Sequence, residues 1–204
     1  MGALAIDVVL LPSGDIMDHA ISLNRALRRV SPAPIALSRT DCVPHVSLAM
    51  GCVVEETIPS LAQALTTLAN SHQPVELTFT GVSVRSSQTG ETVSSLEIAR
   101  NPALQALHEA VMRATAPWFT HHATPEMFVD PASVTASTLG WVNEYPASAS
   151  FDRFWPHITL GVGTVPEGVP LPAPGQAPRL ALCHLGPRCT CRRIVFEVSL
   201  QDRK

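Results

Sequence analysis

The chain has few charged residues and almost no lysine. Charged residues make up 15% of its 204 residues, the formal net charge at pH 7 is −3, and Lys204 is the only lysine among 14 basic residues. These basic residues form no long run. Tight binding of long RNA or DNA usually needs a basic face that contacts several phosphates, so we expect no long nucleic acid and favour a small ligand held by a few arginines.

Long hydrophobic runs and a secretory pattern are also missing. No run of 18 apolar residues occurs, so we expect no transmembrane helix and no membrane partner. The apolar segment 3–11 follows no basic region and carries Asp7 in its middle, and we interpret it as a first strand rather than a signal peptide. Because the five cysteines are an odd number without a secretory signal, we expect reduced thiols and a cytoplasmic location.

The residues that are present predict one folded domain. Hydrophobic residues make up 46% of the sequence, which is enough for a substantial core. We therefore expect a single domain over residues 1–204, and a monomer. The 18 prolines argue against long helices, because proline interrupts the helical hydrogen bonds.

Hydrophobic periodicity predicts an α+β fold with mostly antiparallel sheets. Three segments have the apolar spacing of helices: 15–30, 60–69 and one that starts at Asn101-Pro102. Three segments have the apolar content of strands: 75–85, 92–99 and 194–200. Serine and glycine in residues 86–90 predict a turn, and five prolines in residues 165–178 predict an extended loop.

Two short segments in opposite halves of the chain repeat one pattern. Pro44-His45-Val46-Ser47-Leu48 and Pro156-His157-Ile158-Thr159-Leu160 both read proline, histidine, a β-branched residue, a hydroxyl residue and leucine. Side chains alternate between the two faces of a strand, so each strand presents an imidazole and a hydroxyl on one face and two apolar residues on the other. This repetition predicts two similar lobes, each of which contributes one strand to a shared cleft.

This arrangement of side chains suits the chemistry of a phosphodiester. One neutral imidazole can take a proton from the attacking group, while the other, as imidazolium, gives a proton to the leaving oxygen. The two hydroxyls can donate hydrogen bonds to the phosphoryl oxygens, where negative charge increases in the transition state. Histidine titrates near neutral pH, so this chemistry needs no metal and no cofactor.

The paired motifs resemble those of the 2H phosphoesterase superfamily, whose members include bacterial 2′-5′ RNA ligases and 2′,3′-cyclic nucleotide phosphodiesterases. The resemblance implies a bilobal α+β fold with two antiparallel sheets lining a central cleft, helices outside and pseudo-twofold symmetry. It also implies hydrolysis of a cyclic phosphodiester at a ribose that leaves a 2′-phosphate. His45 and His157 would be the acid–base pair, and Ser47, where the family usually has threonine, would bind the phosphate together with Thr159.

Residues near the motifs are further candidates for substrate binding. Arg39 and Arg153 precede the two motifs and could reach a phosphate, although surface arginines are more often paired or solvated. Trp155 could stack on a base, although core packing is the commoner role of an aromatic residue. Cys183, His184, Cys189 and Cys191 do not have the usual spacing of a zinc site, so we expect no metal there.

Three functions remain open from the sequence. The first is metal-independent hydrolysis of a 2′,3′-cyclic nucleotide or a related small ribose cyclic phosphate. The second is an RNA-end processing enzyme, either a 2′-5′ RNA ligase or an oligonucleotide phosphodiesterase, which the low basic content disfavours. The third is a non-catalytic nucleotide-binding module, which the two intact motifs disfavour. We expect the partner to be a small nucleotide or a short oligonucleotide.

Overall fold

The computed structural model describes residues 2–31, 35–86 and 91–201. Its strands are β1 (Ala3–Leu11), β2 (Val46–Val54), β3 (Val75–Leu77), β4 (Phe79–Ser86), β5 (Thr92–Ile98), β6 (His157–Val162), β7 (Gly175–Ala177), β8 (Arg179–Leu185) and β9 (Cys191–Ser199). Its α-helices are α1 (Gly14–Val30), α2 (Ile58–Ala69), α3 (Pro102–Thr115) and α4 (Ala136–Ser148), and the short 3-10 helices include η4 (Phe151–Arg153) and η5 (Pro187–Cys189). No helix among these residues is both long and apolar enough to cross a membrane.

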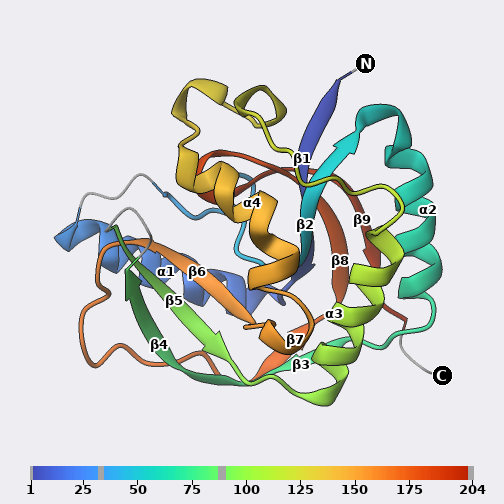
Figure 1. Ribbon diagram of the computed structural model, residues 1–204. Helices are drawn as coiled ribbons and strands as arrows, with labels where there is room; N and C mark the ends of the chain where they lie inside the picture. The colour runs from blue at the N-terminus through green and yellow to red at the C-terminus, as the bar shows by residue number, and fades with distance from the viewer. Residues whose placement is uncertain (1, 32–34, 87–90, 202–204) are drawn as a thin grey trace.

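The strands form antiparallel sheets in two lobes (Figure 1). One sheet has the order β2-β1-β8-β9, the other has the order β4-β5-β6, and β3 and β7 make a short pair. Helices α2 and α3 lie beside each other on the outer side of the first sheet, and α1 packs against β6 of the second. The architecture is therefore the α+β fold with antiparallel sheets that the sequence predicts.

The core follows from the alternation of side chains along the strands. In β1, Ile6, Val8 and Leu10 are fully buried in the main core, together with the apolar faces of α1, α2 and α3. Ala5 and Val9 point to the opposite face of the same sheet and belong to two smaller clusters. The pairing with β2 and β8 satisfies both edges of β1, and the clusters on its two sides bury both faces, as its nearly continuous apolar sequence requires.

Several predicted elements are confirmed, and one helix boundary has a clear cause. Helices occupy the three predicted segments, and strands occupy 3–11 and 92–98. The side chain of Asn101 accepts a hydrogen bond from the Leu104 backbone N–H at 2.8 Å, so it caps α3 as its position before Pro102 indicates. The predicted turn at 86–90 falls largely outside the described residues.

Two predictions need correction, and two elements are new. Segment 75–85 is not one strand, because β3 pairs with β7 whereas β4 pairs with β5. Segment 165–178 is not wholly a loop, since its last residues form β7. The sequence interpretation missed β8 and α4. Helix α4 contains Gly140 and Pro146, which weaken the helical pattern because glycine and proline disfavour helix interiors.

Candidate active site

The first motif lies where the chain enters β2. His45 directly precedes the strand, and Ser47 is its second residue. Val46 and Leu48 are fully buried in the main core, while His45 and Ser47 are partly exposed on the other face. The alternation predicted for this motif is therefore the one the structure shows.

The second motif opens β6 in the same manner. His157 and Thr159 are partly exposed, whereas Ile158 and Leu160 are fully buried. This strand pairs with β5 of the second sheet, where Thr159 faces Ser95 in register. The two motifs thus come from different sheets, as the sequence predicts for two lobes.

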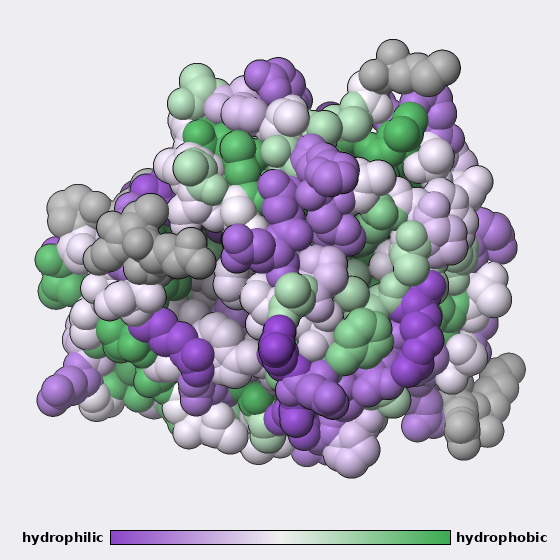
Figure 2. Space-filling model, viewed as in Figure 1, coloured by the Kyte–Doolittle hydropathy of each residue, from purple (hydrophilic) through white to green (hydrophobic). Residues whose placement is uncertain are grey.

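One cavity of about 540 Å³ brings the two motifs together. Its lining includes the four motif residues His45, Ser47, His157 and Thr159, together with Arg85, Trp141, Tyr145, Arg153, Trp155 and Arg188. The face of the molecule in Figure 2 has a hollow near the β4–β5 hairpin, and polar and apolar residues are mixed around it. This volume is in the usual range of pockets for small molecules, and it can hold a nucleotide.

Matching hydrogen bonds fix the tautomers of both imidazoles. His45 Nδ1 lies 2.7 Å from the Val43 carbonyl oxygen, and His157 Nδ1 lies 2.8 Å from the Trp155 carbonyl oxygen. A carbonyl oxygen only accepts, so Nδ1 must carry the hydrogen in both rings. In the neutral ring, Nε2 then keeps a free electron pair and is the nitrogen that can take a proton.

Burial makes both imidazoles weak bases. It lowers the pKa of His45 below its ordinary value of 6.5, and it lowers the pKa of His157 to about 4. A positive charge on His45 contributes to the lowered pKa of His157, so the two rings titrate as a coupled pair. At pH 7 both imidazoles of the free protein are therefore neutral.

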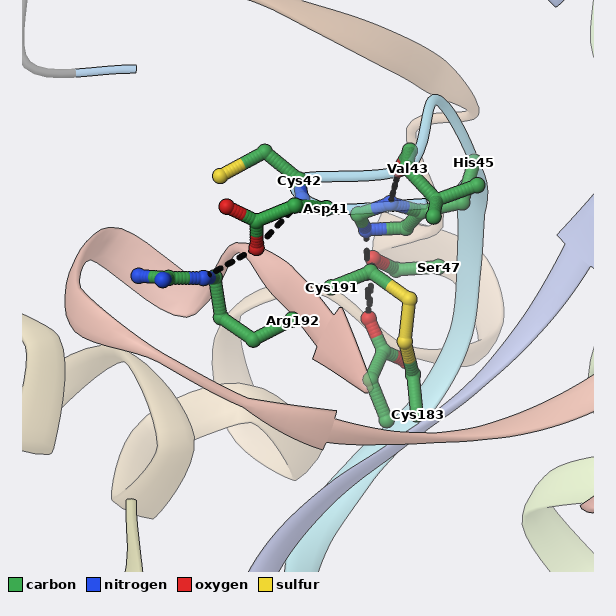
Figure 3. The surroundings of a disulfide bond; sticks show 9 residues. Asp41, Cys42, Val43, His45, Ser47, Cys183, Cys191 and Arg192 are labelled. Carbon is green, nitrogen blue, oxygen red and sulfur yellow. Dashed lines mark hydrogen bonds and ion pairs between the residues drawn. A yellow bond between two sulfur atoms is a disulfide. The ribbon is translucent and has the colours of Figure 1, made fainter. Parts of the chain in front are cut away.

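A buried carboxyl group lies beside the first motif. Asp7 of β1 is fully buried; its Oδ2 atom is hydrogen-bonded to Ser47 Oγ at 2.6 Å and lies 3.7 Å from His45 Nε2. Figure 3 shows His45 and Ser47 next to each other on the same side of β2. In the sequence, Asp7 is only an interruption of an apolar strand, and no local pattern predicts that it lies beside the first motif.

Trp155 lies in the cavity but is already stacked. Its ring lies 3.9 Å from the His157 ring, nearly parallel to it, and the Arg85 guanidinium lies 3.7 Å from the Trp155 ring centre. Two groups this close must occupy opposite faces of the indole. Trp155 therefore supports the His157 ring and offers no free face to a base, whereas Trp141 on α4 lines the same cavity and is 41% exposed.

The predicted arginines are placed differently. Arg39 does not line the cavity; its guanidinium pairs with Asp18 of α1 at 2.8 Å. Arg153 lines the cavity and donates a hydrogen bond to the Ala147 carbonyl oxygen. Arg85 and Arg188 also line the cavity, and no sequence pattern predicts this, because only the fold brings the β4–β5 hairpin and η5 to the cavity.

The expectation of reduced thiols is wrong for two cysteines. Cys183 of β8 and Cys191 of β9 form a disulfide (Figure 3), while Cys42, Cys52 and Cys189 are free. The Cα atoms of the bonded pair are 5.4 Å apart because β8 and β9 are neighbouring antiparallel strands. The sequence spacing alone did not reveal this pairing.

Comparisons with known proteins agree with this geometry. A family model described as the 2′-5′ RNA ligase superfamily matches residues 24–168. No curated protein sequence matches the chain. The structure of E. coli LigT in apo form superposes with a TM-score of 0.56 at 16% identity, over 99% of this chain and 100% of LigT.

Two further structures are similar. LigT complexed with 3′-AMP has a TM-score of 0.56 at 18% identity, over 99% of this chain and 100% of that one. TT0787 of Thermus thermophilus has a TM-score of 0.62 at 14% identity, over 98% of this chain and 100% of that one. These likenesses show the fold, and the family model spans well over half of the chain. The chain belongs to the 2′-5′ RNA ligase superfamily of 2H phosphoesterases.

Proposed function

We propose that this protein hydrolyses a cyclic phosphodiester, either a 2′,3′-cyclic nucleotide or a related small ribose cyclic phosphate, and leaves a 2′-phosphate. Membership of the superfamily indicates phosphoesterase activity in general. The observation that carries the finer proposal is the pair of imidazoles in one cavity, each with Nδ1 bonded to a carbonyl and Nε2 available for proton transfer.

The proposed reaction uses the two imidazoles in opposite roles. The Nε2 atom of one neutral ring takes a proton from a water molecule as the water oxygen attacks phosphorus. The Nε2–H of the other ring, protonated beforehand, gives its proton to the ribose oxygen as the bond between phosphorus and that oxygen breaks. The anionic phosphodiester favours protonation of one ring, which offsets the effect of burial on its pKa.

Hydroxyl groups beside each imidazole would bind the phosphate. Ser47 and Thr159 each stand two residues after a motif histidine on the same strand face. Each can donate a hydrogen bond to a phosphoryl oxygen that is not part of the breaking bond, where negative charge grows in the transition state. We propose Arg153 as a further phosphate contact, because it lines the cavity.

The size and charge of the site favour a small substrate. A cavity of about 540 Å³ matches one nucleotide, and the chain has a net charge of −3. The structures of LigT with 3′-AMP, ATP and NADP+ show that a protein of this fold accepts small nucleotides. These observations favour a cyclic mononucleotide over a long RNA.

A substrate panel in the presence of EDTA tests this proposal. The panel contains the 2′,3′-cyclic nucleotides of the four bases, a 1″,2″-cyclic ADP-ribose phosphate and an oligonucleotide with a 2′-5′ linkage, and chromatography resolves 2′- from 3′-phosphate products. We expect hydrolysis of at least one cyclic monophosphate to a 2′-phosphate, unaffected by chelation. The His45→Ala/His157→Ala double variant, purified in parallel, controls for contaminating phosphodiesterases.

Three outcomes would each contradict a different part of the proposal. Activity that disappears in EDTA and returns with zinc or manganese would exclude the metal-independent mechanism. Cleavage or joining of 2′-5′ linkages without hydrolysis of any cyclic monophosphate would favour the RNA-end enzyme. Binding without turnover across the whole panel would favour a nucleotide-binding module.

A further inference from the structure

Asp7 is a buried carboxyl group that forms no ion pair with an arginine among the residues that the structure describes. It lies in the middle of β1, between Met50 of β2 and Cys183 of β8, and its side chain is fully buried. Its Oδ2 atom contacts Ser47 Oγ, and among the described residues its Oδ1 atom has no hydrogen-bond partner. An ionised carboxylate at such a position is costly, because it gives up its hydration without enough compensating bonds.

The groups that face Asp7 from the neighbouring elements are neutral or only weakly basic. His45, before β2, is the only ion-pair neighbour that Asp7 has among the described residues, and burial lowers the pKa of this imidazole. Tyr145 of α4 and Cys189 of η5 are within electrostatic range, and burial together with Asp7 raises the pKa of both. The disulfide on β8 and β9 carries no charge. In this setting, burial raises the pKa of Asp7 well above its ordinary range.

The protonation state of Asp7 decides which way the Ser47 hydroxyl points. An ionised Asp7 can only accept, so the single hydroxyl hydrogen of Ser47 would point to Asp7 and away from the substrate. Ser47 would then present only lone pairs to a phosphoryl oxygen, which repels them. A neutral Asp7 can donate its own O–H to Ser47 Oγ, and the Ser47 hydrogen becomes available to the substrate.

Building on the proposed phosphodiesterase function, we propose that Asp7 is a positioning residue that stays neutral, donates its proton to Ser47 Oγ and thereby turns the Ser47 hydroxyl hydrogen toward the phosphoryl group. The separation of 2.6 Å fits a hydrogen bond between two oxygens, and Oδ1 is left as the carbonyl oxygen of the acid. In the second motif the residue opposite the hydroxyl is not an acid, because Thr159 pairs in register with the neutral Ser95. The two lobes therefore present their hydroxyls by different means.

The affinity of the protein for sulfate tests whether Asp7 orients the Ser47 hydroxyl, and it requires no catalytic turnover. Sulfate resembles the phosphoryl group and does not titrate between pH 5 and 10, so changes in its affinity report on the protein. We would measure its dissociation constant by calorimetry across this range for the wild-type protein, Asp7→Asn and Ser47→Ala. Asp18→Asn is the matched control, because it removes the same charge from an exposed aspartate on α1 that pairs with Arg39 outside the cavity.

Asp7→Asn mimics the neutral acid, so at pH 6 its sulfate affinity should stay within about threefold of the wild-type value. At any pH of this range at which Asp7 is ionised, the wild-type protein should bind sulfate at least about tenfold more weakly than Asp7→Asn, the size of one hydrogen bond to a charged group. When both proteins also carry Ser47→Ala, Asp7→Asn should change the sulfate affinity less at alkaline pH. Only the direct repulsion between the carboxylate and sulfate then remains. Asp18→Asn should follow the wild-type curve.

Carbon-13 NMR of labelled aspartate reads the carboxyl group directly in the wild-type protein, and the variant is needed only to assign the resonance. One carboxyl resonance of the wild-type protein, absent from Asp7→Asn, should keep the shift of a neutral acid at pH 7. Titration of that resonance below about pH 5, near the ordinary range of aspartate, would overturn the proposal. Tenfold tighter sulfate binding by Asp7→Asn than by the wild-type protein at pH 6 would also overturn the proposal. Such a gain would mean that Asp7 is ionised in the wild-type protein and repels the anion.

These outcomes are separate from those of the substrate panel. A wild-type protein that hydrolyses no cyclic phosphate would contradict the proposed function, while the carboxyl resonance would still show whether Asp7 is neutral. An ionised Asp7 in an active enzyme would contradict only the role of Asp7.

Discussion

Among single residues, His45 and His157 are those whose replacement should reduce activity most. Replacing either with alanine should remove most of the activity on a cyclic phosphodiester, at least about 1,000-fold in kcat/KM, because a neutral base and a protonated acid are needed in the same step. The double variant should be little worse than either single variant, because the two rings act as a unit. Steady-state kinetics of the three variants measure this.

A single histidine variant that kept nearly the wild-type kcat/KM would contradict the paired mechanism. Circular dichroism and thermal unfolding of the variants provide the control for folding. Replacing the exposed His122, which lies outside the cavity lining, with alanine should leave kcat/KM unchanged.

The lowered pKa values of the two histidines predict an acidic optimum. In the free enzyme the acid must be protonated and the base neutral, so kcat/KM is highest between the two apparent pKa values of the pair and falls on either side. Because burial holds the pKa of His45 below 6.5 and that of His157 at about 4, the bell-shaped profile should have its maximum below about pH 6.5. A pH series of kcat/KM with a non-titrating cyclic phosphodiester measures it, and a maximum above pH 7.5 would show that the histidines do not control the rate.

The sequence predicts which strand face each motif residue occupies, because residue spacing reports directly on strand geometry. His45 and Ser47 share one face of β2 as their separation by one residue requires, and the buried Val46 fixes which face that is. Asp7 was not predicted as a site residue, because the sequence does not say that β1 lies beside β2. Trp155 was predicted as a stacking surface, and only the structure shows that Arg85 and His157 already occupy its two faces.

At the scale of elements, α4 is the part of the site that the sequence did not reveal. Its buried Val142 and Tyr145 pack with Met50 of β2, so the helix covers one end of the cavity. Its amphipathic pattern is weak, and Gly140 and Pro146 interrupt it. Local spacing is enough to predict a strongly periodic helix such as α1, whereas α4 is held in place by tertiary contacts.

The position of Trp141 on α4 predicts a role in substrate binding. Trp141 is the exposed tryptophan of the cavity, so its ring can stack on the base of a cyclic nucleotide. Trp141→Ala should raise KM about tenfold with little change in kcat, since stacking acts equally on the ground state and the transition state. Kinetics with a cyclic nucleotide and with a base-free ribose cyclic phosphate distinguish this effect, which should vanish for the base-free substrate. Equal losses on both substrates would mean that Trp141 only holds the helix.

At the scale of the whole molecule, buried side chains tie the two lobes together. Asn24 of α1 donates hydrogen bonds to the carbonyl oxygens of Ile35 and Leu160, at 3.0 and 2.7 Å, and accepts one from the Leu37 backbone N–H. It thereby joins α1 to β6 of the second lobe and to the segment that leads to the first motif. We propose on this basis that residues 1–204 form one bilobal domain.

His108 is a second link, and it makes the stability of the whole molecule depend on pH. Its ring is fully buried, Nδ1 donates to the Leu48 carbonyl oxygen and Nε2 accepts from the Phe151 N–H, both at 2.8 Å. Burial lowers its pKa from 6.5 to about 4. Because the folded pKa is below the unfolded value, His108 contributes fully to stability above about pH 6.5, and its contribution, on the order of 3 kcal/mol, is lost as the pH falls toward about 4.

Urea unfolding at pH 7.5 and 4.5 measures this loss. His108→Gln should be less stable than the wild-type protein at pH 7.5 but should lose less free energy of unfolding between the two pH values. The exposed His122→Gln variant is the control and should follow the wild-type protein. An equal loss in His108→Gln and wild type would assign the acid sensitivity to other groups.

The central place of β1 has a consequence for how the chain is made. Its Ile6 pairs with Gly51 on one side and with His184 on the other, so its two neighbours are translated far apart in time. While the ribosome is still producing the second lobe, one edge of this apolar strand has no partner and is open to other chains. Pairings between such distant segments also fold slowly, so the newly made protein depends on protection of that edge until β8 has emerged.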